Sequence, residues 1–283
     1  MTQRPMKECS DKHNKKHINS NSQYILMPRL STLKVFLDRL YDTDTGSSLK
    51  TGAHTKKRKK DTKQKGIILR GKGYVKKIAL CVNATNETIQ LAIDSKADML
   101  IAHNIEELDK TVAEKKFAIL KDTRITLYVT GMSMDTLYVY GTDYILAKAI
   151  GLKSTQRLEK KTKRGLFGTS RISTYQMFQR RINWLTHEAS EAYQNNKETI
   201  KKAAVCMGET PEEHILKIAV DNSCNTILCN TGNIALKTSA KDLNINLFIA
   251  NYTATEKLTL LALKKIIDDK FTTKTVLLDE PDY

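Results

Sequence analysis

The stretch that decides the fold is VKKIALCVNATNETIQLAIDSKADMLIAHN, which runs from Val75 to Asn104. A basic pair precedes a run of β-branched and aliphatic residues, and polar turn residues follow that run. Apolar residues then recur at helical spacing, at Ile89, Ala92 and Ile93, before a second apolar run that ends at His103. This order predicts a strand, a helix and a second strand. A helical crossover of this length favours parallel pairing of the two strands.

The same pattern occurs a second time, in IKKAAVCMGETPEEHILKIAVDNSCNTILCNTG at residues 200–232, where Cys206 takes the place of Cys81. Two copies predict an α/β protein of two related halves with mixed, largely parallel sheets. Ligands in open α/β sheets bind beyond the carboxyl ends of the strands. The side chains that follow each second run are therefore candidates for a site: His103, Asn104, Asn230 and Thr231.

Composition and pattern divide the chain into four segments. We expect a basic N-terminal extension at 1–29, a first α/β half at 30–152 with a disordered basic loop near 43–66, a basic linker at 153–173 and a second α/β half at 174–283. A helix is expected after Gly141, with Thr142 as its N-terminal cap and Gly151 at its end. Another helix is expected to open at Glu256.

The positive charge lies near the N-terminus. The formal net charge is +16, and residues 1–77 carry 20 Lys and Arg against 6 Asp and Glu. The centre of this charge has almost no apolar residue, which predicts a disordered loop. Its cations are expected to contact a polyanion such as nucleic acid, or to serve as a nuclear-import signal; a solvated loop without a partner is the alternative. These cations are Lys56, Lys57, Arg58, Lys59 and Lys60.

No long apolar segment occurs, and the N-terminus lacks the apolar core of a signal peptide. We therefore expect an intracellular, cytoplasmic protein that does not enter a membrane, with a nuclear location as the alternative. No phosphate-binding loop, GxSxG nucleophile motif or dinucleotide-binding fingerprint is present in the sequence.

The order of the strand-end motifs resembles the GTP cyclohydrolase I type 2 homolog family, also called the Nif-three-like proteins, over roughly residues 30 to 280. The family's Ala-Asp strand that ends in His-His-Pro is matched by ADMLIAHNI at 97–105. Its "YxxHTxxD" is matched by YVTGMSMD at 128–135, and its "GHYxTE" by ANYTATE at 250–256. The resemblance implies the Nif-three-like fold, assembly as a homo-oligomeric ring, and a two-metal site between the halves.

Only part of the family's set of metal ligands is present at the matching positions of this sequence. Three positions keep a ligand of the family's type: His103, Asp135 and Glu256. Three positions have lost the family's imidazole: Asn104, Gly131 and Asn251. The spacing from Asn251 to Glu256 is also longer than in the family. An amide is a poor ligand for a transition metal, and glycine offers no side chain. We therefore expect at most one divalent transition-metal ion, weakly bound.

These ligands lead to three competing functions. The first is a divergent family member with a degraded dinuclear metal site, acting as a non-catalytic interaction or scaffold protein. The second is a metal-dependent hydrolase acting on a nucleotide or phosphoester. The third is a nucleic-acid or ribosome-associated binder. Each ligand also has a purely structural interpretation: His103 as a hydrogen-bonded residue at a strand end, Asp135 as a cap, and Glu256 as an acid near a helix N-terminus.

Overall fold

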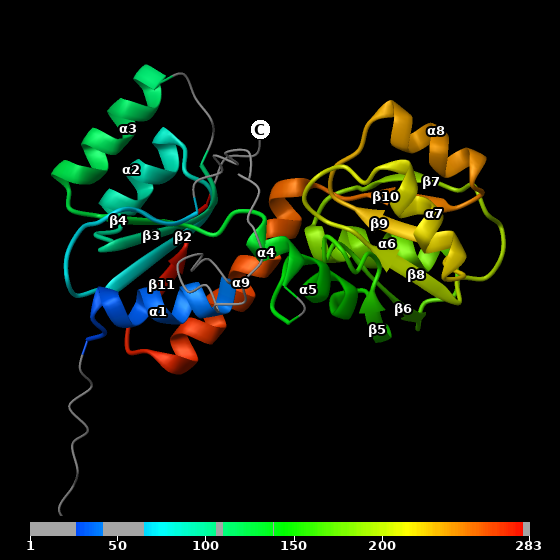
Figure 1. Ribbon diagram of the computed structural model, residues 1–283, viewed down its shortest axis with the longest axis horizontal. Coiled ribbons are helices and arrows are strands. Elements are labelled where there is room, and N and C mark those ends of the chain that lie inside the picture. The colour runs from blue at the N-terminus through cyan, green and yellow to red at the C-terminus, as the bar shows by residue number, and fades with distance from the viewer. Residues whose placement is uncertain (1–26, 42–64, 106–109, 138, 280–283) are drawn as a thin grey trace, which may run out of the picture.

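The computed structural model describes residues 27–41, 65–105, 110–137 and 139–279. Two β-sheets lie side by side, and each has helices on both faces (Figure 1). Most of the expected extension at 1–29 and of the basic loop near 43–66 falls outside the described residues. The polyanion contact of Lys56–Lys60 therefore stays a prediction. None of the helices within the described ranges is both long enough and apolar enough to cross a lipid bilayer.

The first sheet has the strand order β1-β4-β3-β2-β11. Its strands are β1 Gly66–Leu69, β2 Lys77–Asn83, β3 Met99–Asn104, β4 Thr126–Val129 and β11 Lys274–Leu277. Strands β4, β3, β2 and β11 are parallel to one another, and β1 pairs antiparallel with β4 at the edge. The stretch from Val75 to Asn104 forms β2, the helix α2 and β3, which confirms the predicted strand, helix and parallel strand.

Both faces of the first sheet are covered, because successive side chains of a strand point to opposite faces. Ile78 and Leu80 of β2 pack with α1 (Leu30–Tyr41) and α9 (Tyr252–Lys270). Ala79 and Cys81 of the same strand pack on the other face, with α2 (Asn86–Asp94) and α3 (Lys110–Asp122).

The second sheet has the order β5-β6-β8-β9-β10-β7. Its strands are β5 Leu152–Arg157, β6 Leu166–Ser170, β7 Glu191–Tyr193, β8 Lys202–Val205, β9 Thr226–Cys229 and β10 Asn246–Ile249. Helices α5 (Thr142–Ala149) and α6 (Tyr175–Thr186) belong to the core on one face. Helices α7 (Glu213–Asp221) and α8 (Ile234–Asp242) belong to the core on the other. The second copy of the repeat is β8-α7-β9, and its two strands are parallel, as predicted.

The structure differs from the expected segments in two places. The expected linker at 153–173 contains β5 and β6, which pair antiparallel at the edge of the second sheet. Exposed basic residues such as Lys153 are common on edge strands, and they gave this segment the composition of a loop. The expected second half at 174–283 also ends early: α9 leads back to the first half, where β11 pairs with β2 (Figure 1).

Candidate metal centre

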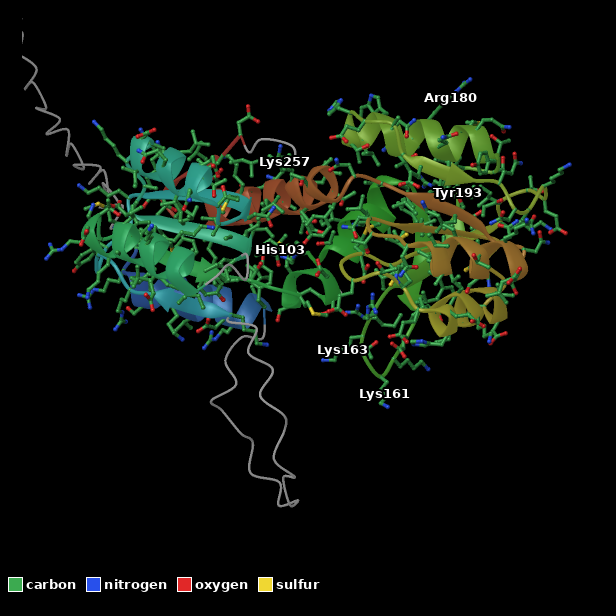
Figure 2. The ribbon with its side chains drawn as sticks, turned by 90° about the horizontal axis from the view of Figure 1, so that it is seen from above. His103, Lys161, Lys163, Arg180, Tyr193 and Lys257 are labelled. Atoms are coloured by element: carbon green, nitrogen blue, oxygen red, sulfur yellow. The ribbon has the colours of Figure 1, made fainter. Side chains whose placement is uncertain are left out.

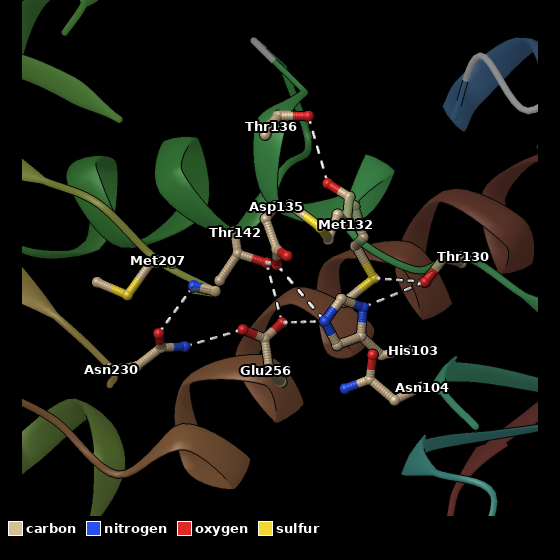
Figure 3. Close-up of polar contacts among 12 residues, drawn as sticks. His103, Asn104, Thr130, Met132, Asp135, Thr136, Thr142, Met207, Asn230 and Glu256 are labelled. Carbon is tan, nitrogen blue, oxygen red and sulfur yellow. Dashed lines mark hydrogen bonds and ion pairs between the residues drawn. The ribbon is translucent and has the colours of Figure 1, made fainter. Parts of the chain in front are cut away.

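Three side chains from separate elements meet between the two halves. His103 lies near the end of β3, Asp135 is on the short helix α4 (Ser133–Thr136), and Glu256 is in α9. His103 Nε2 lies 3.6 Å from Asp135 Oδ1 and 3.8 Å from Glu256 Oε2 (Figure 3). One ligand atom from each residue lies within 4.8 Å of the other two. The three residues predicted from the sequence are therefore brought together, and we call them the triad.

The triad is almost closed to solvent, with 1%, 3% and 0% of His103, Asp135 and Glu256 exposed. Burial lowers the pKa of His103 to about 4, so its imidazole is neutral at pH 7. Burial raises the pKa of Glu256 to about 8. Burial, and then the negative charges of Glu256 and Asp143, raise the pKa of Asp135 well above its ordinary value. Without a cation, the two carboxyl groups of the triad therefore retain protons near neutral pH.

Thr142 joins the two acids of the triad. Its Oγ1 lies 3.2 Å from Asp135 Oδ1 and 3.0 Å from Glu256 Oε2. A hydroxyl carries one hydrogen, so it donates to one carboxylate while a protonated carboxyl donates to it. The expectation that Thr142 caps α5 was wrong. The N-cap residue is Gly141, and the hydroxyl of Thr142 forms hydrogen bonds with the two acids of the triad.

Asn230, which follows the second copy of the repeat, orients Glu256 from the other side. Its Nδ2 donates to Glu256 Oε1 at 2.9 Å and lies 2.9 Å from Thr255 Oγ1. Its Oδ1 accepts from the backbone N–H of Gly208 at 2.8 Å. This strand end therefore supports the triad through the amide of Asn230.

A third buried acid, Asp143, lies behind the triad. Its carboxylate accepts from the backbone N–H groups of Gly165 and Met207, each at 2.8 Å. Burial nevertheless raises its pKa to about 7. Because the backbone bonds hold Asp143 to β6 and to the end of β8, it connects the second sheet to the helix that carries Thr142.

Gly208 is placed against Asp135. A Cβ built on this glycine would lie 2.8 Å from Asp135 Oδ2, and its φ of +85° is in the region that favours glycine. The segment AVCMGET therefore contributes a close backbone approach, which restricts where the side chain of Asp135 can lie, and an N–H group that bonds to Asn230.

The three positions that resemble lost histidines have structural roles here. Asn104 Nδ2 donates to the Tyr252 hydroxyl at 2.7 Å. Gly131 has a φ of +57° in the turn after β4. Asn251 is the N-cap of α9, and its side chain accepts from the backbone N–H of Ala254. The residues at these positions therefore serve a hydrogen bond, a turn and a helix cap.

The donor set of the triad fits one metal ion. A neutral imidazole with two carboxylates suits a divalent transition metal such as zinc, iron or manganese. His103 Nδ1 lies 3.3 Å from Thr130 Oγ1, a contact that fixes the ring from the side opposite Nε2. No other group of three His, Cys, Asp or Glu side chains close enough to hold an ion occurs within the described ranges.

Sequence reasoning missed the partners of the triad. Asn230 was predicted to lie at a strand end, but its bond to Glu256 was not predicted. Asp143 could have been found, because it shares a helix face with the buried Leu146, Ala147 and Ile150. An acid on an apolar face indicates a buried, hydrogen-bonded carboxyl group.

Comparisons with known proteins agree with this fold. A GTP cyclohydrolase 1 type 2 homolog from Pyrococcus abyssi is 28% identical over 233 residues, which is 78% of this chain and 91% of that protein. The solved structure of ybgI, a protein of unknown function, aligns with a TM-score of 0.76 at 16% identity, covering 90% of this chain and 99% of the other. Reduced HcgD from Methanocaldococcus jannaschii aligns with a TM-score of 0.74 at 17% identity, covering 90% and 100%.

At such low identity the structural matches establish the fold alone. Family membership rests on the sequence: the family model for Duf34/NIF3 (NGG1p interacting factor 3) matches residues 49–281. The chain belongs to the Duf34/NIF3 family.

Proposed function

We propose that this chain is a Duf34/NIF3 protein with a degraded dinuclear site, which holds at most one divalent transition-metal ion and acts as a non-catalytic interaction or scaffold protein. One observation supports the proposal most strongly. At the three positions where the family resemblance expects imidazoles for a second ion, this chain has Asn104, Gly131 and Asn251, and each has a structural role instead.

A bound divalent ion would supply a positive charge that allows Asp135 and Glu256 to ionise together, and it would act as a Lewis acid. His103 would hold it through Nε2, and the two acids through their carboxylates. Thr142 and Asn230 would keep the carboxylates oriented. With the triad at most 3% exposed, a substrate has little access to such an ion. This burial supports a structural role for the metal.

Metal content tests the proposal. Purified protein is loaded with Zn²⁺ or Mn²⁺, dialysed, and analysed for metal per chain. We expect at most one ion, which is lost in His103→Ala. The matched control is His214→Ala, since His214 is exposed and pairs with Glu159 at the surface. Two retained ions per chain, or equal retention in His103→Ala, would contradict the one-ion triad.

A metal-dependent hydrolase acting on a nucleotide or phosphoester is the second candidate. It is favoured by Asp143, a buried carboxyl group that contacts the segments around the triad without being one of its three ligands, and whose pKa of about 7 lies where proton transfer is effective at neutral pH. Hydrolysis of a phosphomonoester by metal-loaded protein, lost in Glu256→Gln but retained in the exposed variant Glu213→Gln, would favour this candidate over the scaffold.

Homo-oligomerisation is also proposed, on the basis of the family resemblance. Light scattering that finds monomer alone across a broad concentration range would contradict it.

A nucleic-acid or ribosome-associated role is the further alternative. It would depend on the cations Lys56, Lys57, Arg58, Lys59 and Lys60. Replacing these five cations with glutamine should then abolish binding to a polyanion at low salt.

A further inference from the structure

A pocket of about 520 Å³ lies beside the metal centre and is not part of it. Three of its lining residues are cations, Lys65, Arg157 and Lys163. Ser133 and Thr136 add hydroxyl groups. Leu137 adds apolar surface, and the almost fully buried Tyr41 completes the described lining. Its volume is within the range of small-molecule sites, and no carboxylate is among the lining residues that the structure describes.

The cations come from two segments far apart in the sequence, the residue before β1 and the β5–β6 hairpin, and they line the same pocket. Lys65 directly precedes β1, Arg157 ends β5, and Lys163 lies in the turn between β5 and β6. The guanidinium of Arg157 is half-buried and held in place: Nη1 donates to the backbone carbonyl of Lys163 at 2.6 Å, and Nη2 donates to that of Thr136. Lys65 Nζ donates to Ser133 Oγ at 3.5 Å. A guanidinium held in place by two backbone carbonyls, with two ammonium groups lining the same pocket, is well suited to an oxyanion.

We infer that this pocket binds a small organic phosphate of about nucleotide size. The cations and hydroxyl groups would bind the phosphate, and the partly exposed Leu137 would contact the organic part. A phosphate has three oxygens that accept charge-assisted hydrogen bonds, whereas a carboxylate has two. A pocket with several cations and hydroxyl groups therefore suits a phosphate better. This inference goes beyond the proposed function, because the pocket uses none of the triad residues.

The pocket and the triad share one element. The four-residue helix α4 contributes Ser133 and Thr136 to the pocket and Asp135 to the triad. Arg157 contacts the carbonyl at the end of this same helix. A ligand in the pocket would therefore lie next to the segment that carries a metal ligand. Binding is nevertheless tested on metal-free protein. The result then shows whether this pocket binds the ligand, regardless of whether the triad binds a metal.

The test is calorimetric titration of metal-free protein with adenosine monophosphate, inorganic phosphate and adenosine. We expect the monophosphate to bind, inorganic phosphate to bind more weakly, and adenosine to bind at least about tenfold more weakly than the monophosphate because it lacks the charge-assisted bonds. Affinity for the monophosphate should fall as salt is raised. No binding of the monophosphate, or equal binding of adenosine, would overturn the inference.

Substitutions localise the binding to this pocket. Lys163→Gln and Lys65→Gln should each weaken binding of the monophosphate about tenfold. Lys161→Gln is the matched control, because Lys161 is exposed on the same turn (Figure 2) but does not line the pocket. All three lysines are exposed, so the melting temperature should stay unchanged.

If Lys161→Gln weakens binding of the monophosphate as much as Lys163→Gln does, the binding depends on general surface charge. That result would contradict a specific site in this pocket. A single-stranded oligonucleotide serves as the last probe. If it binds in a manner that depends on Lys163 while the monophosphate does not bind, the pocket belongs to a nucleic-acid surface and the small-ligand inference is wrong.

Discussion

Asn104 donates from Nδ2 to the hydroxyl of Tyr252 at 2.7 Å, which joins the end of β3 to the start of α9. In the resemblance to the family, position 104 corresponds to the second histidine of His-His-Pro. Here that position links the first sheet to the helix that carries Glu256. The amide therefore helps to hold the start of α9 against the end of β3.

Removing this bond is expected to affect stability more than metal content. Tyr252→Phe leaves the Asn104 amide without its acceptor and should lower the free energy of unfolding by about 1 kcal/mol. Denaturant unfolding measures the loss, and Tyr193→Phe is the control, since the partners of its hydroxyl, Glu191 and Lys237, lie at the surface and far from the triad, at the edge of the second sheet. A Tyr252→Phe protein that lost its metal would show that this link controls the triad directly.

Restoring the three histidines is expected not to restore a second ion. Asn251→His removes the cap of α9 at a cost of about 1 kcal/mol, and histidine at position 131 would take the left-handed φ of +57°. The triple variant Asn104→His, Gly131→His, Asn251→His should therefore be less stable and still hold at most one ion. Elemental analysis beside a melting curve measures both, and a stable variant with two ions would contradict the structural roles assigned to these positions.

Gly208→Ala tests how closely the backbone approaches Asp135. The added methyl group would meet Oδ2 at 2.8 Å, and alanine is strained at a φ of +85°. We expect a destabilisation of about 1–3 kcal/mol together with weaker metal retention, because Asp135 must move. Gly73→Ala is the matched control, since a Cβ there meets no atom within 4 Å. Unchanged metal retention in Gly208→Ala would show that Asp135 keeps its place without this contact.

The local elements of this fold could be predicted from the sequence, but the long-range connections could not. The repeat predicted β2-α2-β3 and β8-α7-β9, because apolar periodicity is a local signal. The pairing of β11 with β2 depends on contacts between the two ends of the chain, which no local pattern contains. Similarly, the resemblance identified His103, Asp135 and Glu256, whereas the bonds of Thr142 and Asn230 to these acids depend on how the halves pack.

The buried acids make the stability of the metal-free protein depend on pH. Glu256, with its pKa raised to about 8, and Asp143, raised to about 7, keep protons in the folded state that the unfolded chain has already released. Asp135 is shifted in the same direction. His103, with its pKa lowered to about 4, has the opposite effect, but only below its unfolded value of 6.5. Between pH 6.5 and pH 8 the folded state therefore binds more protons than the unfolded state, and stability falls as pH rises.

We therefore expect the melting temperature of metal-free protein to fall by a few degrees from pH 6.5 to pH 8 (roughly the effect of one such proton on a domain of this size). Glu256→Gln should reduce this slope, because the amide keeps an oxygen for Asn230 and does not titrate. Glu213→Gln is the control, since Glu213 is exposed and pairs with Lys217 on the surface of α7. A divalent ion should reverse the trend, because it binds the ionised carboxylates and is taken up more readily as protons leave them. A melting temperature that rises with pH in the metal-free protein, or a slope that Glu256→Gln leaves unchanged, would show that the triad acids are ionised without a cation.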